Sequence, residues 1–181
     1  MRDHIETEHL TLRPFKAEDA EAAYSWLGDG EVMRYMPAGP DGSLGQTIAR
    51  LATYREHQLV YGYSKWLVSD RDSGAPIGDA GLLWLPGAEN VDLGFRFLKH
   101  SWGRGFGREV ARAWIHVAFA ELNLARLAAF AHPENTNAFR VLDRVGFRRI
   151  GICRVLGMEA VSFGLEWGDA RLFSPEKGAG R

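Results

Sequence analysis

The chain has 181 residues, of which 46% are hydrophobic and 25% charged, the ordinary composition of one folded domain. Its formal net charge of −1 argues against a polyanionic partner such as nucleic acid, and no apolar run reaches the roughly 20 residues of a membrane helix. A single cysteine, Cys153, excludes an internal disulfide framework. We expect a cytoplasmic protein with no signal peptide and no nucleic-acid or membrane partner.

The first half of the chain is predicted to combine strands with two helices. Residues 9–13 alternate in hydrophobicity and stop at Pro14, which indicates a strand. Helices are predicted over 17–27 and 44–57, with a loop rich in Gly and Pro between them. Three strands follow, separated by turn residues that indicate hairpins: 63–69, 76–85 and 91–98.

The second half is predicted to alternate helices and strands. The expected elements are a helix over 105–122, a strand over 126–131, a helix over 135–145 that stops at Gly146, a strand from Phe147 and a strand over 159–166. The whole pattern predicts a single α+β domain over residues 1–172, with a flexible tail at 173–181. Its sheet should be mixed and mostly antiparallel, with about seven strands and helices on both faces.

The strongest motif is a glycine-rich segment between a predicted strand and a predicted helix. It consists of Trp102, Gly103, Arg104, Gly105, Phe106 and Gly107. Alternate glycines let backbone N–H groups turn towards one point, and the start of a helix adds its own unpaired N–H groups. Arg104 and Arg108 add positive charge. The segment therefore predicts an anion site suited to a diphosphate.

Two other phosphate-binding loops fit this segment less well. A P-loop needs Gly-Lys-Ser/Thr at the helix start, whereas Gly107 is followed by Arg108 and Glu109. The dinucleotide fingerprint needs G-x-G-x-x-G near the first strand, whereas these glycines are spaced G-x-G-x-G and lie late in the chain. A tight strand-to-helix turn without any ligand is the structural alternative.

The downstream residues carry a more specific resemblance. The W-G-x-G-x-G pattern from Trp102 is followed by Asn135 and, after a predicted helix, by Gly146-Phe147. With these motifs the chain resembles the GNAT superfamily of N-acetyltransferases, especially the branch of ribosomal-protein N-terminal acetyltransferases. Similar segments at 11–14 and 29–36 extend the resemblance over nearly all of the chain before Arg171. It implies a GNAT-like fold and an enzyme that moves an acetyl or other short acyl group from coenzyme A to a primary amine.

The resemblance also implies roles for individual residues. The glycine-rich segment and Arg108 would bind the coenzyme A pyrophosphate, and the backbone of Phe97 and Leu98 would align the pantetheine arm. A main-chain N–H at Phe97 would also stabilise the developing oxyanion. Asn135 would contact the cofactor, although Asn is equally a good N-cap for the helix that follows.

Proton transfer is only partly accounted for by this pattern. Asp92 is the preferred base, working through water, with Glu89 as the second candidate and a solvated carboxylate as the alternative. The positions where the family carries a general acid are occupied by Ala138 and Leu142, which are apolar. Coenzyme A is acidic enough to leave as a thiolate, because a thiol has an ordinary pKa of about 8.5.

The acceptor is the least defined part. Trp26, Tyr35 and Met36 are the predicted acceptor contacts, and the acceptor is a small-molecule amine or a protein N-terminus. We expect no metal, because the histidines show no ligand spacing. A homodimer, and a longer or succinyl donor, stay open. The competing functions are a non-catalytic acyl-coenzyme A sensor and a nucleotide-binding enzyme.

Overall fold

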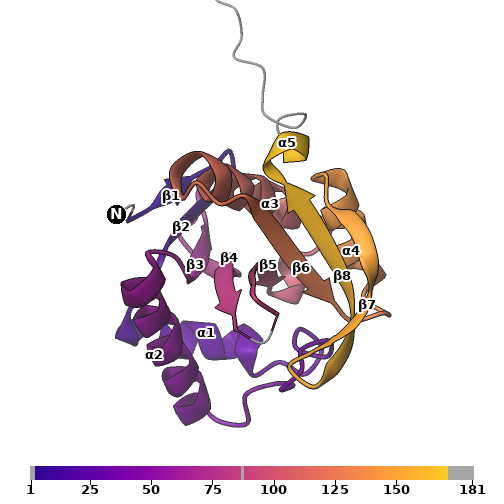
Figure 1. The fold of residues 1–181 in the computed structure, drawn as a ribbon. Helices are drawn as coiled ribbons and strands as arrows, with labels where there is room; N and C mark the ends of the chain where they lie inside the picture. The colour runs from indigo at the N-terminus through magenta and orange to yellow at the C-terminus, as the bar shows by residue number, and fades with distance from the viewer. Residues whose placement is uncertain (1–2, 87, 171–181) are drawn as a thin grey trace, which may run out of the picture.

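The computed structural model describes residues 3–86 and 88–170 of the chain. Within them one sheet has eight strands in the order β1-β2-β3-β4-β5-β6-β8-β7 (Figure 1). Neighbouring strands are antiparallel except β5 and β6, which run parallel. The predicted mixed, mostly antiparallel sheet is confirmed, with eight strands in place of about seven. The segment 173–181, predicted to be a tail, lies outside the described residues.

The strands of the first half form an antiparallel meander. They are β1 (Ile5–Glu6), β2 (Leu10–Pro14), β3 (Lys65–Asp70), β4 (Pro76–Leu85) and β5 (Asn90–Phe97). The sequence did not predict β1, because two residues are too few to show a period. The predicted hairpin between β3 and β4 is closed by Asp70, whose carboxylate accepts from the Ser73 N–H at 3.0 Å.

One face of this half is covered by helices. They are the 3-10 turn η1 (Ala17–Asp19), α1 (Ala20–Leu27) and α2 (Leu44–Tyr61). Helix α2 begins after Ser43, whose hydroxyl accepts from the Gln46 N–H at 3.3 Å, and ends at Gly62 with φ of 79°. Apolar side chains of both helices pack on Leu67 of β3, so this face has its own small core.

The second half supplies the remaining elements. They are α3 (Phe106–His116), the π-helical turn η3 (Val117–Glu121), β6 (Arg126–Ala131), α4 (Thr136–Arg144), β7 (Arg148–Val155), β8 (Met158–Glu166) and α5 (Trp167–Ala170). Helices α3 and α4 pack on the face of the sheet opposite to α1 and α2 (Figure 1). The larger core lies there, where Trp114 and Leu142 meet Leu93 and Leu127. The single helix predicted over 105–122 is thus an α-helix that continues as a π-turn.

The sheet opens between β5 and β6. Their ladder consists of one pair among the described residues, Asp92 with Ala128, and residues 93–97 of β5 have no ladder partner in β6. On the other side of this pair, the guanidinium Nε of Arg126 donates to the side-chain oxygen of Asn90 at 2.9 Å. The strands are therefore held together at one end and leave the edge of β5 open at the other. This opening positions the site.

Candidate functional site

The glycine-rich segment forms a cradle of backbone donors. Gly103 and Gly105 have φ of 75° and 86°, in the left-handed region that favours glycine. Gly105 is the N-cap of α3 and offers no side chain to the helix end. Within the described part of the chain, no carbonyl accepts from the N–H groups of residues 103–107, and the first bonds of the helix run from Arg108 and Glu109 to the Gly105 oxygen. Several free donors at the positive end of a helix are an arrangement that can bind an anion.

Two contacts hold this cradle against the sheet. The indole Nε1 of Trp102 donates to the main-chain oxygen of Phe97 at 2.7 Å, across the short turn η2 (Lys99–Ser101). A Cβ at Gly107 would lie 3.1 Å from the ring of Phe95, so the first turn of α3 packs closely on β5. The position of the cradle is therefore set by the end of β5.

The first turn of α3 is also fixed from the other side. The carboxylate of Glu109 accepts from the Thr7 hydroxyl at 2.5 Å, from the His9 N–H at 2.8 Å and from the His9 ring at 3.0 Å. The bond from its ring to Glu109 raises the pKa of His9. The turn between β1 and β2 thus helps to position the helix start, a contact that the sequence did not indicate.

The two arginines of the segment differ in their surroundings. Arg104 lies 3.7 Å from the carboxylate of Asp70 and over the ring of Phe106, with 4.5 Å to the centroid. Arg108 is exposed and has no side-chain partner among the described residues. Arg108 therefore has the free charge, while that of Arg104 is shared with the β3–β4 turn.

The backbone of β5 presents donors to the opening. The Leu98 N–H donates to Ile77 at 2.8 Å and the Leu98 oxygen accepts from Ser101 at 2.9 Å, so both groups of Leu98 are occupied within the fold. Because Leu98 is hydrogen-bonded to Ile77, the next pair, Phe97 with Gly78, is of the non-hydrogen-bonded type. The Phe97 N–H therefore points away from β4 towards the opening. The same alternation turns the Phe95 N–H in that direction. Phe95 was not predicted from the sequence, although the two-residue period of a strand could have indicated it.

Asp92 lies where the strands part. Its carboxylate accepts from the Phe130 N–H of β6 at 3.2 Å. Burial raises the pKa of Asp92 above its ordinary value, and it is opposed by the charge of Lys65, the Phe130 N–H and Arg96. Glu89 is exposed in the turn before β5, with φ of 48°. The geometry thus favours Asp92 over Glu89 as the base, and it adds Lys65, which the sequence did not indicate.

A buried ion pair lies beside this position. Arg96 contacts Asp79 at 2.6 Å and donates to the Tyr54 hydroxyl at 2.8 Å. The indole of Trp26 donates to the other carboxylate oxygen of Asp79 at 2.7 Å and has 0% exposure. Trp26 is therefore a core residue that supports this pair, and it has no surface for the acceptor contact predicted from the sequence.

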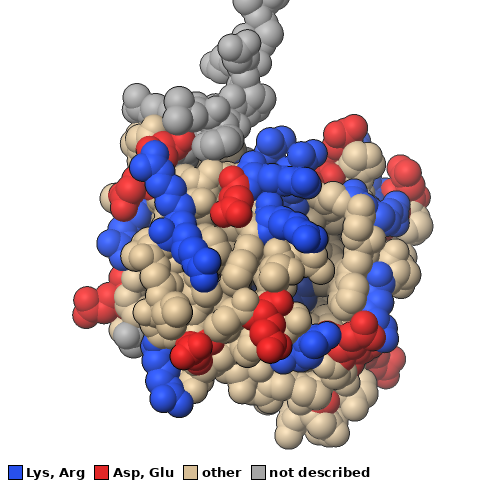
Figure 2. Space-filling model, turned by 90° about the vertical axis from the view of Figure 1, so that its right-hand side faces the viewer, with Lys and Arg blue, Asp and Glu red and all other residues tan. Residues whose placement is uncertain are grey.

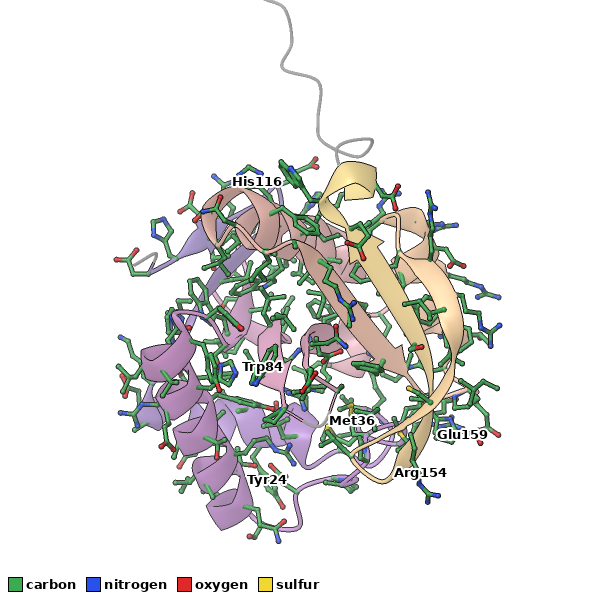
Figure 3. The ribbon with its side chains drawn as sticks, in the orientation of Figure 1. Tyr24, Met36, Trp84, His116, Arg154 and Glu159 are labelled. Atoms are coloured by element: carbon green, nitrogen blue, oxygen red, sulfur yellow. The ribbon has the colours of Figure 1, made fainter. Side chains whose placement is uncertain are left out.

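The other predicted acceptor residues are accessible. Tyr35 is half-buried and stacks on the ring of His132, with 5.2 Å between centroids, and Met36 is 38% exposed. In the view of Figure 3, Met36 lies between Trp84 of β4 and Arg154 of β7. The loop between α1 and α2 thus reaches the end of β6.

A groove lies on the part of the sheet that α1 and α2 leave uncovered. It has a volume of about 340 Å³ and is lined from β6 by Ala128 and Phe130, which alternate with core residues of the opposite face. Because Ala128 is the ladder partner of Asp92, the groove adjoins the opening. Arg126, Arg154 and Glu166 also line it. The side of the molecule with α4 and β7 likewise carries basic groups with acidic ones between them (Figure 2).

Helix α4 contains no proton donor at the positions expected for a general acid. The side-chain oxygen of Asn135 accepts from the Ala138 N–H at 3.2 Å, so Asn135 is the N-cap of this helix. Ala138 is half-buried and Leu142 is 3% exposed, and both pack in the core. A cofactor contact of Asn135 stays a prediction.

Neither a metal site nor a membrane-spanning helix was found in the part of the chain that the structure describes. Over residues 3–86 and 88–170, no group of three His, Cys, Asp or Glu side chains is arranged to hold a metal ion. No described helix combines the length and apolar character needed to cross a bilayer.

Comparison with known proteins decides the family. Residues 9–148 match the sequence model of the acetyltransferase (GNAT) domain. The chain belongs to the GNAT acetyltransferase family. It is also similar to the uncharacterized N-acetyltransferase YnaD of Bacillus subtilis, with 29% identity over 166 residues that cover 92% of each chain.

Solved structures show the same fold. The ribosomal-protein-S5-alanine acetyltransferase of Vibrio fischeri superposes with a TM-score of 0.77 and 19% identity, over 93% of this chain and 98% of the other. The aminoglycoside acetyltransferase AAC(6')-Ib in complex with coenzyme A gives a TM-score of 0.77 and 17% identity, over 92% and 99%. The predicted GNAT fold and family are therefore confirmed.

Proposed function

We propose that this protein is an N-acyltransferase that moves an acetyl group from acetyl-coenzyme A to a primary amine by direct attack. One observation carries the proposal. A single strand, β5, bears a carboxylate at Asp92, open N–H groups at Phe95 and Phe97, and the anion cradle directly after its end. This order of groups along the strand matches the order of amine, thioester, pantetheine and pyrophosphate in a reacting pair.

The donor is held mainly by backbone groups. The pyrophosphate binds the N–H groups of residues 103–107, and the exposed guanidinium of Arg108 adds charge. The pantetheine amides pair with the open edge of β5 as an added strand would. Asn135 contacts the cofactor from the start of α4.

The chemistry needs one base and one oxyanion donor. The acceptor arrives as an ammonium group and loses a proton to Asp92 through water. The neutral amine then attacks the thioester carbon, and the oxyanion of the tetrahedral intermediate accepts a hydrogen bond from an open N–H of β5, at Phe95 or Phe97. The carbon–sulfur bond breaks, coenzyme A leaves as a thiolate, and the second proton of the amine passes to solvent. Holding both substrates in line supplies much of the remaining rate.

The acceptor approaches through the groove beside β6. The mixed charge of its lining, with Arg126, Arg154 and Glu166, does not favour a polycation over a peptide. Tyr35 and Met36 of the α1–α2 loop contact the acceptor from the end of β6, where Tyr35 stacks on His132. A protein N-terminus or a small-molecule amine fits this open, mixed surface.

A non-catalytic acyl-coenzyme A sensor is the second candidate, favoured by the apolar Ala138 and Leu142. Calorimetry with acetyl-coenzyme A, combined with thiol release over a panel of peptide N-termini and small amines, separates the two. Binding with turnover of at least one amine supports the acyltransferase. Binding without turnover of any amine supports the sensor, and absence of binding contradicts both.

A further inference from the structure

A lysine crosses the sheet on the face of the acceptor site. Lys65 of β3 is paired in register with Gly81 of β4, and Gly81 is paired with Gly94 of β5. The three residues therefore lie in one row across three strands. The Lys65 side chain runs along this row and its Nζ donates to the Gly81 oxygen at 2.9 Å. Lys65 is only 6% exposed, although lysine is seldom buried unless its charge is paired.

Gly94 makes the room for this side chain, and Gly81 lets the backbone of β3 lie close to β4. A Cβ on Gly94 would lie 2.5 Å from the Lys65 Nζ, closer than real contacts allow. A Cβ on Gly81 would lie 2.0 Å from the Ser64 oxygen and 2.9 Å from the Lys65 Cα. Because Gly94 does not have a positive φ, its backbone does not require glycine, and the need for space is the reason for it.

The space beside Gly94 also adjoins Asp92. The same Cβ on Gly94 would lie 3.6 Å from the Asp92 carboxylate, so the ammonium group and the carboxylate both border the empty side of one glycine. Other charged groups also act on Lys65: Asp79 attracts its charge, Arg96 repels it, and His57 of α2 is affected by it. Asp92 is the partner at the opening, because Asp79 is engaged by Arg96 at 2.6 Å.

We propose that Lys65 is a positioning residue of the catalytic centre, whose ammonium group lies beside Gly94 on the same side as Asp92 and keeps that carboxylate ionised. The inference rests on the proposed function, in which Asp92 is the base. Burial opposes ionisation of Asp92, and a base that is already protonated cannot accept the proton of the amine. Lys65 acts in its protonated form, which prevails at pH values below its pKa of about 8, and the proton taken from the amine leaves Asp92 to solvent.

The first test is Lys65→Met, which keeps the length of the side chain and removes its charge. An opposite charge within about 4 to 6 Å lowers a carboxyl pKa by about 1 to 3 units. We expect the acidic limb of the kcat/KM profile to move up by about that amount, with activity recovered at higher pH. Lys16→Met is the matched control, because Lys16 is exposed and lies near Glu18 rather than Asp92.

The second test keeps the lysine and fills the space beside Gly94. Gly94→Ala should displace the Nζ and move the acidic limb in the same direction. On the Lys65→Met background it should add little, because both changes act through one group. Gly42→Ala is the control, since its Cβ would meet its nearest neighbour at an ordinary 3.5 Å. Gly94→Ala also serves if Lys65→Met does not fold.

A third measurement needs no turnover. Carbon-13 NMR of labelled aspartate follows the titration of Asp92 in the wild-type protein and in Lys65→Met. A higher pKa of Asp92 in Lys65→Met supports the inference, whether or not any amine is acetylated. Absence of acetylation would overturn only the proposed function. Unchanged Asp92 titration and an unchanged acidic limb, in folded Lys65→Met with normal acetyl-coenzyme A binding, overturn the inference and leave the proposed function standing.

Discussion

The indole Nε1 of Trp102 donates to the main-chain oxygen of Phe97 at 2.7 Å, and this bond ties the anion cradle to the open edge of β5. Trp102 is nonetheless 46% exposed, so its ring contributes little to the core. We expect Trp102→Phe to weaken acetyl-coenzyme A binding by up to about tenfold, the value of one hydrogen bond of about 0.5 to 1.5 kcal/mol. Calorimetric titration measures this loss. A large fall in melting temperature without loss of affinity would contradict it.

The left-handed backbone of the cradle allows a test with a matched control. Gly105 has φ of 86° and Gly157, in the β7–β8 turn, has φ of 79°, and neither would place a Cβ within 4 Å of another group. Alanine at either position should cost about 1 to 2 kcal/mol of stability. Only Gly105→Ala should also weaken acetyl-coenzyme A binding, because only there does the methyl group enter the cradle. Equal affinities of the two variants would argue against the cradle as the binding site.

The proposed base is tested by a change that keeps its shape. Asp92→Asn should lower kcat by about 10² to 10⁴ while acetyl-coenzyme A still binds, because general-base catalysis contributes about that factor. Glu89→Gln, in the exposed turn before β5, should leave the rate unchanged. Steady-state kinetics over a pH series decides the matter, and equal rates for Asp92→Asn and the wild-type protein would remove Asp92 from the mechanism.

Burial of Lys65 predicts a dependence of stability on pH. The pKa of Lys65 falls to about 8 from its ordinary 10.5, chiefly because burial disfavours the charged form. Between these values the unfolded state binds more protons than the folded state, so the free energy of unfolding should rise with pH. The rise is at most about 3 kcal/mol at 1.36 kcal/mol per unit. This added stability is complete above the pKa of Lys65 in the unfolded state. It is lost as the pH falls through the pKa of Lys65 in the folded state.

Urea denaturation of the wild-type protein and Lys65→Met between pH 7.5 and about 11 measures this effect as a difference. The comparison cancels the contributions of all other groups, which both proteins share. Parallel stability curves would show that Lys65 has an ordinary pKa in the folded state.

Local features of the site could be predicted from the sequence. The cradle depends on a short segment in which glycine spacing and a helix start act together, so the sequence located all of it. The N-cap role of Asn135 could also be predicted, because capping involves only the next three residues, whereas its cofactor contact stays a prediction. Whether the backbone groups of Leu98 are free, and whether Trp26 is accessible, depends on neighbours in other strands and helices. The sequence did not indicate that both Leu98 groups are already hydrogen-bonded or that Trp26 is buried.

By itself, the sequence determined the family, the mixed sheet and the glycine-rich turn before α3, because these follow from hydrophobic periods and from motifs within a few residues of each other. Only the tertiary structure decided which carboxylate lies at the opening and which charge accompanies it. Lys65 and Gly94 lie far apart along the chain, and only the register of three strands places them in one row beside Asp92. Strand register is set by the packing of whole faces, so no local pattern around Lys65 reveals it.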